Sequence, residues 1–215
     1  MTAAVLLLSG CASPLPGFPG SSATPHEPTS TGSAGLGDIP QGFIECHGEP
    51  PKDGELVADV DLTKLTAPTP PGFRTATGYH EDNPVEGASS GQFWVPVNQL
   101  DTLDVASINV YPQMELGPLA VTCDEISWRE IVKRIEQYHE INGAQIIEET
   151  TRSSVAGMPA VREEVSLPDS GYDYIGWWIF GRGQLAHVYC QWTSEAARQT
   201  LVDACDTLAA TIVVE

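Results

Sequence analysis

Positive charge is scarce in this chain of 215 residues. Ten Lys and Arg residues stand against 29 Asp and Glu residues, which gives a formal net charge of −19 at pH 7. A field of this sign repels phosphate backbones and anionic lipid headgroups. The composition therefore argues against nucleic-acid binding and against a basic patch that lies on a membrane surface. It leaves a cationic partner open.

The sequence also lacks a hydrophobic run long enough to cross a membrane. A transmembrane helix needs about 20 apolar residues, and the apolar start is complete by Leu8. Residues 1–10 therefore indicate part of a secretory signal peptide. Leu8-Ser9-Gly10-Cys11 resembles the lipobox of bacterial lipoproteins, which implies transfer of a diacylglyceryl group to the Cys11 sulfur and cleavage before it. No Lys or Arg precedes the run, so we expect the signal peptide to extend upstream.

Large apolar side chains are rare from residue 11 to residue 40, where Pro, Gly, Ser, Thr and Ala predominate. Such a stretch cannot offset its ordering entropy by burial, so we predict a flexible tether. Its expected reach is roughly 30 Å. The tether would hold one globular domain, residues 41–215, clear of the membrane. The expected location is extracytoplasmic, with the lipidated Cys11 as the attachment to the cell membrane.

Cysteine pairs at metal-ligand spacing are missing, so we predict no metal site. Four cysteines remain besides Cys11, and an even number in an exported domain indicates two disulfides with three possible pairings. Residues 184–192 are typical of a strand, and the helix that follows would fold back so that Cys205 lies over Cys190. By elimination the second predicted disulfide joins Cys46 to Cys123.

The pattern of apolar residues predicts an α+β fold, an antiparallel β-sheet with helices packed on it. Ser127 and Glu130 form a capping box for a helix that Asn142-Gly143 ends. A second helix is expected over residues 194–210, and residues 50–72 form a Pro-rich break. Strands, or strand-like segments, are expected at 42–48, 91–97, 104–112, 144–151, 158–167, 172–181 and 184–192.

These features together resemble the LpqN-type lipoproteins of actinobacteria, which carry a PsbP-like domain. The resemblance lies in the lipobox at Cys11, the tether, "VAGMPAVREEV" (155–165) leading into an aromatic hairpin, and "ACDTLAATIVV" (204–214). It implies an αβα sandwich that binds partners in the cell envelope and has no established active site. No catalytic residue and no cofactor are implied.

Three motifs are weak candidates for chemistry. "GASSG" (87–91) places Ser89 where an esterase nucleophile would be, but a polar loop precedes it and a strand follows, which favours a plain loop. "DVD" (59–61) and "HEDN" (80–83) offer oxygen ligands without an EF-hand pattern, which favours solvated surface charge. His139 lies in the last helical turn, where a partial positive charge suits the helix dipole.

The hairpin at 172–192 offers the candidate binding face. A three-residue loop, Gly181-Arg182-Gly183, would pair the strands so that aromatic and polar side chains share one face. A two-residue turn at Arg182-Gly183 would exchange the faces. The favoured interpretation is that the helix at 127–143 covers this face through Trp128 and Tyr138, which would make its members core residues. The predicted face contains Asp173, Ile175, Trp177, His187, Tyr189 and Gln191.

The leading functional hypothesis is a lipid-anchored envelope lipoprotein that acts as a non-enzymatic binding module for a protein or a cell-wall component. The alternative is a carrier with a pocket for a lipid or another small apolar ligand. A hydrolase that uses Ser89 with His80 or His187 is the least favoured interpretation.

Overall fold

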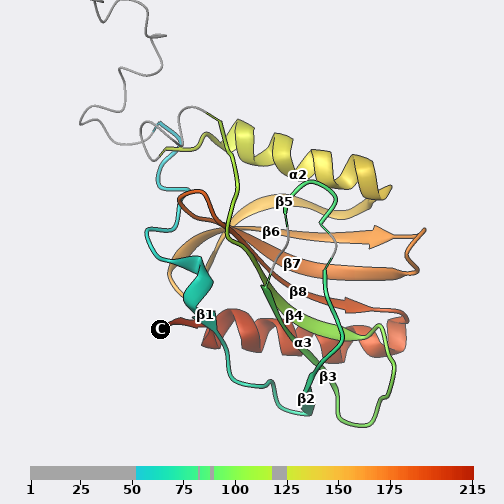
Figure 1. The fold of residues 1–215 in the computed structure, drawn as a ribbon. Coiled ribbons are helices and arrows are strands. Elements are labelled where there is room, and N and C mark those ends of the chain that lie inside the picture. The colour runs from blue at the N-terminus through green and yellow to red at the C-terminus, as the bar shows by residue number, and fades with distance from the viewer. Residues whose placement is uncertain (1–51, 82, 88–89, 118–124) are drawn as a thin grey trace, which may run out of the picture. The chain divides into compact units, whose positions relative to one another are not determined.

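The computed structural model describes residues 52–81, 83–87, 90–117 and 125–215. Its main sheet has seven antiparallel strands in the order β2-β3-β4-β8-β7-β6-β5 (Figure 1). This confirms the expected α+β class. The strands are β2 Phe73–Ala76, β3 Ser90–Pro96, β4 Val105–Tyr111, β5 Gln145–Val155, β6 Met158–Leu167, β7 Tyr172–Phe180 and β8 Leu185–Trp192.

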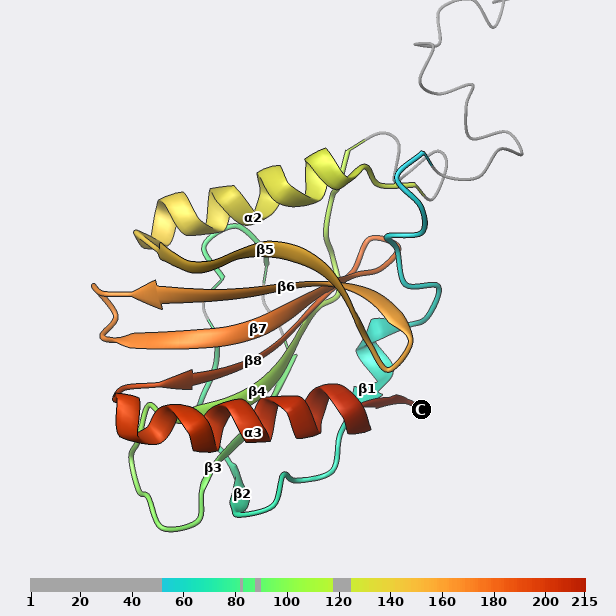
Figure 2. The ribbon, with the colours of Figure 1, turned by 180° about the vertical axis from the view of Figure 1, so that it is seen from behind.

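Two helices cover opposite faces of this sheet. Side chains alternate between the faces of a strand, so the neighbours Trp177 and Trp178 on β7 point to opposite sides. Trp177 packs in one core with residues of α3 (Glu195–Thr211), and Trp178 packs in another with residues of α2 (Trp128–Asn142). The layers are therefore helix, sheet and helix, with α2 above and α3 below the strands in Figure 1 and again in the reverse view of Figure 2.

Short elements at the start of the described domain join its two ends. The 3-10 helix η3 (Leu62–Lys64) leads into β1 (Leu65–Thr66), which pairs antiparallel with the C-terminal β9 (Val213–Val214). Sequence patterns did not predict η3, β1 or β2, because these elements are short and lie within the expected Pro-rich break at 50–72 or directly after it. The strand-like segment expected at 42–48 lies outside the described residues.

The ends of α2 follow from its sequence. The Ser127 side chain accepts a hydrogen bond from the Glu130 backbone N–H at 3.2 Å, and Gly143 adopts the left-handed conformation with φ 63°. Both were expected from the capping box and the Asn142-Gly143 pair. The helix buries Ile131, Ile135 and Tyr138 against the sheet.

Helix α3 returns along the sheet and is joined covalently to it. Cys205 lies on its buried side with Leu201, Ala204 and Leu208, and forms a disulfide with Cys190 of β8. The Cα atoms of the two cysteines are 5.7 Å apart. This is the pairing that the sequence predicted. Cys11, Cys46 and Cys123 lie outside the described residues.

The predicted binding face is wrong because the hairpin turn has two residues instead of three. Gly181 donates a backbone hydrogen bond to Gln184 O at 2.8 Å, so Arg182 and Gly183 form the turn and Phe180 pairs with Leu185. This pairing differs by one residue from the expected one, and such a shift moves every side chain of one strand to the opposite face. The predicted six residues are therefore split between the two faces.

The corrected faces have different membership. Ile175 and Trp177 lie with Cys190 on the α3 side of the sheet, and Asp173 pairs with Trp192 on that side. His187, Tyr189 and Gln191 lie on the α2 side. There they pair across the hairpin with the β7 residues of the same face, which are Trp178, Gly176 and Tyr174 respectively.

Candidate ligand pocket

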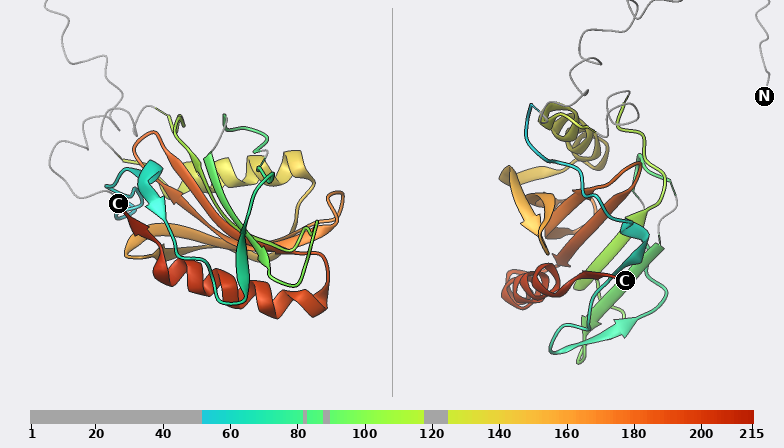
Figure 3. Two further views of the ribbon diagram at one scale, coloured as in Figure 1. Left: turned by 60° about the horizontal axis from the view of Figure 1, so that its bottom comes forward. Right: turned by 90° about the vertical axis from the view of Figure 1, so that its left-hand side faces the viewer.

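A cavity of about 320 Å³ lies on the α2 side of the sheet. Its walls come from all the strands from β3 to β8 except β5, from the C-terminal end of α2 and from residues 79–81, 83 and 84. Five of the six tyrosines of the chain line it, together with three of the five histidines. These residues are Tyr79, Tyr138, Tyr172, Tyr174, Tyr189, His80, His139 and His187. The left view of Figure 3 shows α2 running along this side of the strands.

The strand register sets polar side chains beside one another beneath this cavity. Asn109 of β4 pairs with His187 of β8, which pairs with Trp178 of β7. In the next row, Ser107 pairs with Tyr189, and Tyr189 pairs with Gly176. Ser107, Asn109 and His187 are all buried. A buried layer of this polarity is unusual for a sheet that packs under a helix, since buried positions are normally apolar.

Gly176 gives His187 the room that it occupies. A Cβ atom built on Gly176 would lie 2.9 Å from His187 Nε2, 2.9 Å from Tyr189 Cβ and 3.1 Å from the Val188 carbonyl oxygen. No ordinary side chain tolerates such distances. A residue without a side chain is therefore required where the imidazole lies over β7.

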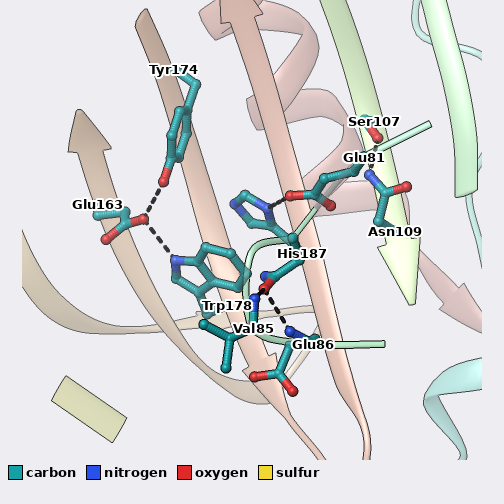
Figure 4. Close-up of polar contacts among 10 residues, drawn as sticks. Glu81, Val85, Glu86, Ser107, Asn109, Glu163, Tyr174, Trp178 and His187 are labelled. Atoms are coloured by element: carbon teal, nitrogen blue, oxygen red, sulfur yellow. Dashed lines mark hydrogen bonds and ion pairs between the residues drawn. The ribbon is translucent and has the colours of Figure 1, made fainter. Parts of the chain in front are cut away.

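The imidazole of His187 is held on both faces and at one edge. Its ring stacks on Trp178 with centroids 3.5 Å apart and an interplanar angle of 8°, and on Tyr189 at 4.5 Å and 24°. His187 Nδ1 lies 2.7 Å from Glu81 Oε1 (Figure 4). Because an ionised carboxylate only accepts hydrogen bonds, Nδ1 carries the proton, and Nε2 of the neutral ring is then an acceptor.

Two atoms of this pair have no hydrogen-bond partner among the described residues. They are His187 Nε2 and Glu81 Oε2, and both are buried. Residue His187 is 3% exposed, and the Glu81 side chain is 15% exposed. Buried polar atoms are nearly always paired in folded proteins, so an unpaired couple beside a cavity indicates a place where a ligand or water donates. Glu81 is thus not the solvated surface charge that the sequence predicted.

A second carboxylate, Glu163 of β6, is fully buried next to the cavity. It accepts hydrogen bonds from Tyr174 Oη at 2.6 Å and Trp178 Nε1 at 2.7 Å (Figure 4), and its Oε2 lies 3.0 Å from His139 Nε2. Burial alone would raise the pKa of Glu163, but the hydrogen bond and charge of His139, with the two other donors, outweigh it and lower that pKa below its usual value. His139 lies in the last turn of α2, as expected, and it also fixes α2 to the sheet.

The phenols around the cavity stay neutral. Burial raises the pKa of Tyr174 and of Tyr189 well above the usual value for tyrosine. Negative charge adds to this effect, from Glu163 at Tyr174 and from Glu81 at both residues. Burial and the nearby carboxylates therefore both disfavour a further anion at these two residues.

Helix α2 covers only part of this face. The Tyr138 ring packs on Trp178 with centroids 5.0 Å apart, in agreement with the expectation that this helix covers the face through Tyr138. Trp128 instead lies under the guanidinium of Arg152, 4.9 Å from its ring centroid. The last turn of the helix and the residue after Gly143 line the pocket, through His139, Asn142 and Ala144.

Sequence reasoning placed half of the predicted face in the pocket. His187, Tyr189 and Gln191 line it, whereas Asp173, Ile175 and Trp177 do not. Sequence reasoning missed the other lining residues and their partners, which come from β6, from β7 and from residues 79–81, 83 and 84. A signal for β7 was present, since Tyr172, Tyr174, Gly176 and Trp178 alternate along one strand; the remaining partners, Glu81 and Glu163, carry no local pattern. Ser89 lies outside the described residues.

Comparisons with known proteins add little. Neither the protein-family models nor the curated proteins contain a match to this chain. Among solved structures, the solution structure of cyanobacterial PsbP (CyanoP) from Synechocystis sp. PCC 6803 is similar over 79% of this chain and 99% of its own length. The TM-score is 0.45 and the sequence identity is 13%. At these values the likeness supports no inference about a ligand or a partner.

Two searches of the described residues complete the account of the site. They contain no helix of the length and hydropathy that a membrane span requires. Within the same residues, no three side chains of His, Cys, Asp or Glu come together as metal ligands would.

Proposed function

We propose that this protein is a non-enzymatic binding module of the cell envelope that holds a small polar ligand in the pocket under α2. The observation that carries this proposal is His187, buried beside a cavity of about 320 Å³, with Nε2 unpaired among the described residues. Ligand pockets combine aromatic walls with a few placed polar groups. The rings around His187 and the Glu81 carboxylate fit that description.

The size and lining of the pocket favour a small polar molecule over a lipid chain. Ligand pockets span about 300–1,000 Å³, so this one lies near the lower end. Its walls carry tyrosine hydroxyls, imidazoles and the Glu81 carboxylate. Transfer of an acyl chain against such groups would leave them without water or partners. The carrier alternative is thereby narrowed from a lipid or apolar ligand to a polar one.

The proposed location follows from the sequence and the disulfide. Lipidation of Cys11, a tether over residues 11–40 and membership of the LpqN-type lipoproteins of actinobacteria are parts of the same proposal. The disulfide between Cys190 and Cys205 supports it, because such bonds persist in oxidising compartments. The second proposed disulfide, Cys46–Cys123, belongs to the same framework. The ligand can be free or presented by an envelope protein or a cell-wall component.

A fragment screen on the full chain tests the pocket. The chain is labelled with ¹⁵N at its tryptophan indoles, and charged and neutral fragments are added in turn. Ligands in the pocket are expected to shift the Nε1–H signal of Trp178, which lines it, and to leave that of Trp177 in place, since Trp177 faces α3. The bound fragments should be recovered chemically unchanged.

Two outcomes would contradict the proposal. One is that no fragment of any charge shifts Trp178. The other is that fragments shift Trp177 and leave Trp178 unaffected, which would place ligand binding on the opposite face of the sheet.

A further inference from the structure

We infer that the pocket selects a small organic cation with N–H donors, such as a protonated amine, whose charged group lies beside Glu81 and His187. This inference rests on the proposed function and names the ligand class of the same pocket. It follows from the charge of the lining, from the hydrogen-bonding character of the unpaired atoms and from the aromatic walls.

The charge of the lining is one-sided. Among the described residues that line the cavity there is no Lys or Arg, and Glu81 is an acid. Glu163 adds a second carboxylate immediately behind Tyr174 and Trp178. The net charge of the chain, −19, has the same sign and raises the local concentration of cations. His139 offsets the charge of Glu163, so Glu81 is the carboxylate that an anion entering this pocket would meet, with no Lys or Arg in the described lining to attract it.

The two unpaired atoms are hydrogen-bond acceptors, so a ligand that pairs with them must carry donors. Glu81 Oε2 is an acceptor, and with Nδ1 donating to Glu81 Oε1, His187 Nε2 is also an acceptor. Trp178 and Tyr189 cover the two faces of the imidazole, so only its edge can meet a ligand. A primary ammonium group has three N–H donors and can donate to Glu81 Oε2. His187 Nε2 lies on the edge of the ring away from Glu81 and takes a separate donor from the ligand or from water. A neutral alcohol has one donor and lacks the attraction between opposite charges that an ammonium group has with the carboxylate.

The walls suit a cation as well. The faces of aromatic rings attract a cation that lies within about 6 Å of the ring centroid, and this attraction grows when water is excluded. Five tyrosine rings line the cavity. Burial is the main cause of the raised pKa of Tyr174 and of Tyr189, and the smaller contribution of Glu81 to both is the part that favours a cation.

Calorimetric titration of the full chain with matched probes tests the ligand class. The probes are n-butylammonium, its neutral counterpart n-butanol, its anionic counterpart butyrate, and tetramethylammonium, which has charge without N–H donors. We expect n-butylammonium to bind roughly tenfold or more tightly than n-butanol, and butyrate to bind least. Equal or tighter binding of n-butanol or butyrate overturns the inference. Tetramethylammonium binding as tightly as n-butylammonium overturns the requirement for N–H donors.

A pair of variants tests whether the Glu81 carboxylate supplies the negative charge that attracts the ligand. Glu81→Gln keeps the size of the side chain and removes its charge, and it should weaken n-butylammonium binding by roughly tenfold or more. Glu136→Gln removes the same charge from an exposed position on α2 and should leave binding unchanged. Unchanged binding by Glu81→Gln, with the Trp178 indole signal in its native position, overturns the assignment. The probe series is independent of the variants, so it decides the matter even if Glu81→Gln does not fold.

The failure of this inference differs from the failure of the proposed function. If neutral or anionic fragments shift the Trp178 indole and ammonium probes do not, the ligand class is wrong and the pocket keeps its function. If no probe shifts Trp178, both are wrong.

Discussion

The two faces of the β7–β8 hairpin differ in chemistry although the same two strands form them. The face under α3 is apolar, with Ile175, Trp177 and Ile179 of β7 next to Val188 and Cys190 of β8. The face under α2 carries the buried imidazole of His187, and Gln191 and Tyr174 line the same cavity. The alternation of side chains along a strand allows one hairpin to form an apolar core on one face and a polar cavity on the other.

The difference extends to how closely each helix approaches the sheet. Helix α3 presents small residues, Ala204 and Cys205, so its backbone comes within 5.7 Å of β8 at the disulfide. Helix α2 meets the sheet through the large rings of Tyr138 and Trp178. Small residues let α3 pack closely on the sheet, whereas the large rings of Tyr138 and Trp178 separate α2 from it. A cavity lies in this space beside the last turn of α2. Binding is thus expected to depend on the α2 face alone, whereas both faces contribute to stability.

The largest effect is expected from Glu163→Ala on the α2 face. This change leaves the donors of His139, Tyr174 and Trp178 without their acceptor. Removal of one partner from a buried ionic network costs about 3–5 kcal/mol, so we expect a loss of that size in the free energy of unfolding, measured with urea. The control is Glu148→Ala, which removes a half-exposed carboxylate paired with Arg162 and should cost about 1 kcal/mol or less. Equal losses in the two variants would mean that Glu163 is not a structural centre of the face.

Removal of the disulfide is expected to reduce stability and leave binding intact. Cys190 and Cys205 are 15 residues apart in sequence, for which the chain-entropy model gives about 3 kcal/mol. The double variant Cys190→Ala/Cys205→Ala should lose about that much in urea unfolding. Its affinity for n-butylammonium should match the wild type, because the bond lies on the α3 face. A weaker affinity at full folding would show that the two faces are coupled.

Gly176→Ala tests whether the α2 face needs the space beside β7 that the His187 imidazole occupies. The added methyl group would contact His187 Nε2 and Tyr189 Cβ at 2.9 Å, so we expect a loss of about 1–3 kcal/mol from overpacking. The displaced imidazole should also weaken ligand binding, as measured by calorimetry. Gly87→Ala is the control, since a Cβ there meets nothing within 4 Å. Native affinity in Gly176→Ala would exclude His187 from the binding site.

The sequence predicted much of this architecture and only part of the site. Hydrophobic alternation located β3 to β8, and the capping box fixed α2, because these signals are local. The Cys190–Cys205 disulfide followed from a strand and a helix that are adjacent in sequence. The pocket depended on the hairpin register, where Arg182-Gly183 admits two turns that differ by one residue, and on tertiary contacts of Glu81 and Glu163. Nothing in the local sequence distinguishes Glu163 from an exposed carboxylate on a strand. Its role follows only from its tertiary contacts with Trp178 and His139.

The smallest effect concerns the acid stability of the α2 face. The pKa of Glu163 is lower in the folded chain than its usual value, since His139 and two other donors outweigh the cost of burial. The carboxylate therefore contributes stability above the unfolded value of about 4.3, and this contribution is lost as the pH falls through the lower folded-state pKa. Glu163→Gln has no such titration. Urea unfolding between about pH 6 and pH 3 should show the wild type losing more stability than this variant below about pH 4.3. Parallel pH profiles would mean that another carboxylate governs acid unfolding, and the α2 face would then be no more sensitive to acid than the apolar face under α3.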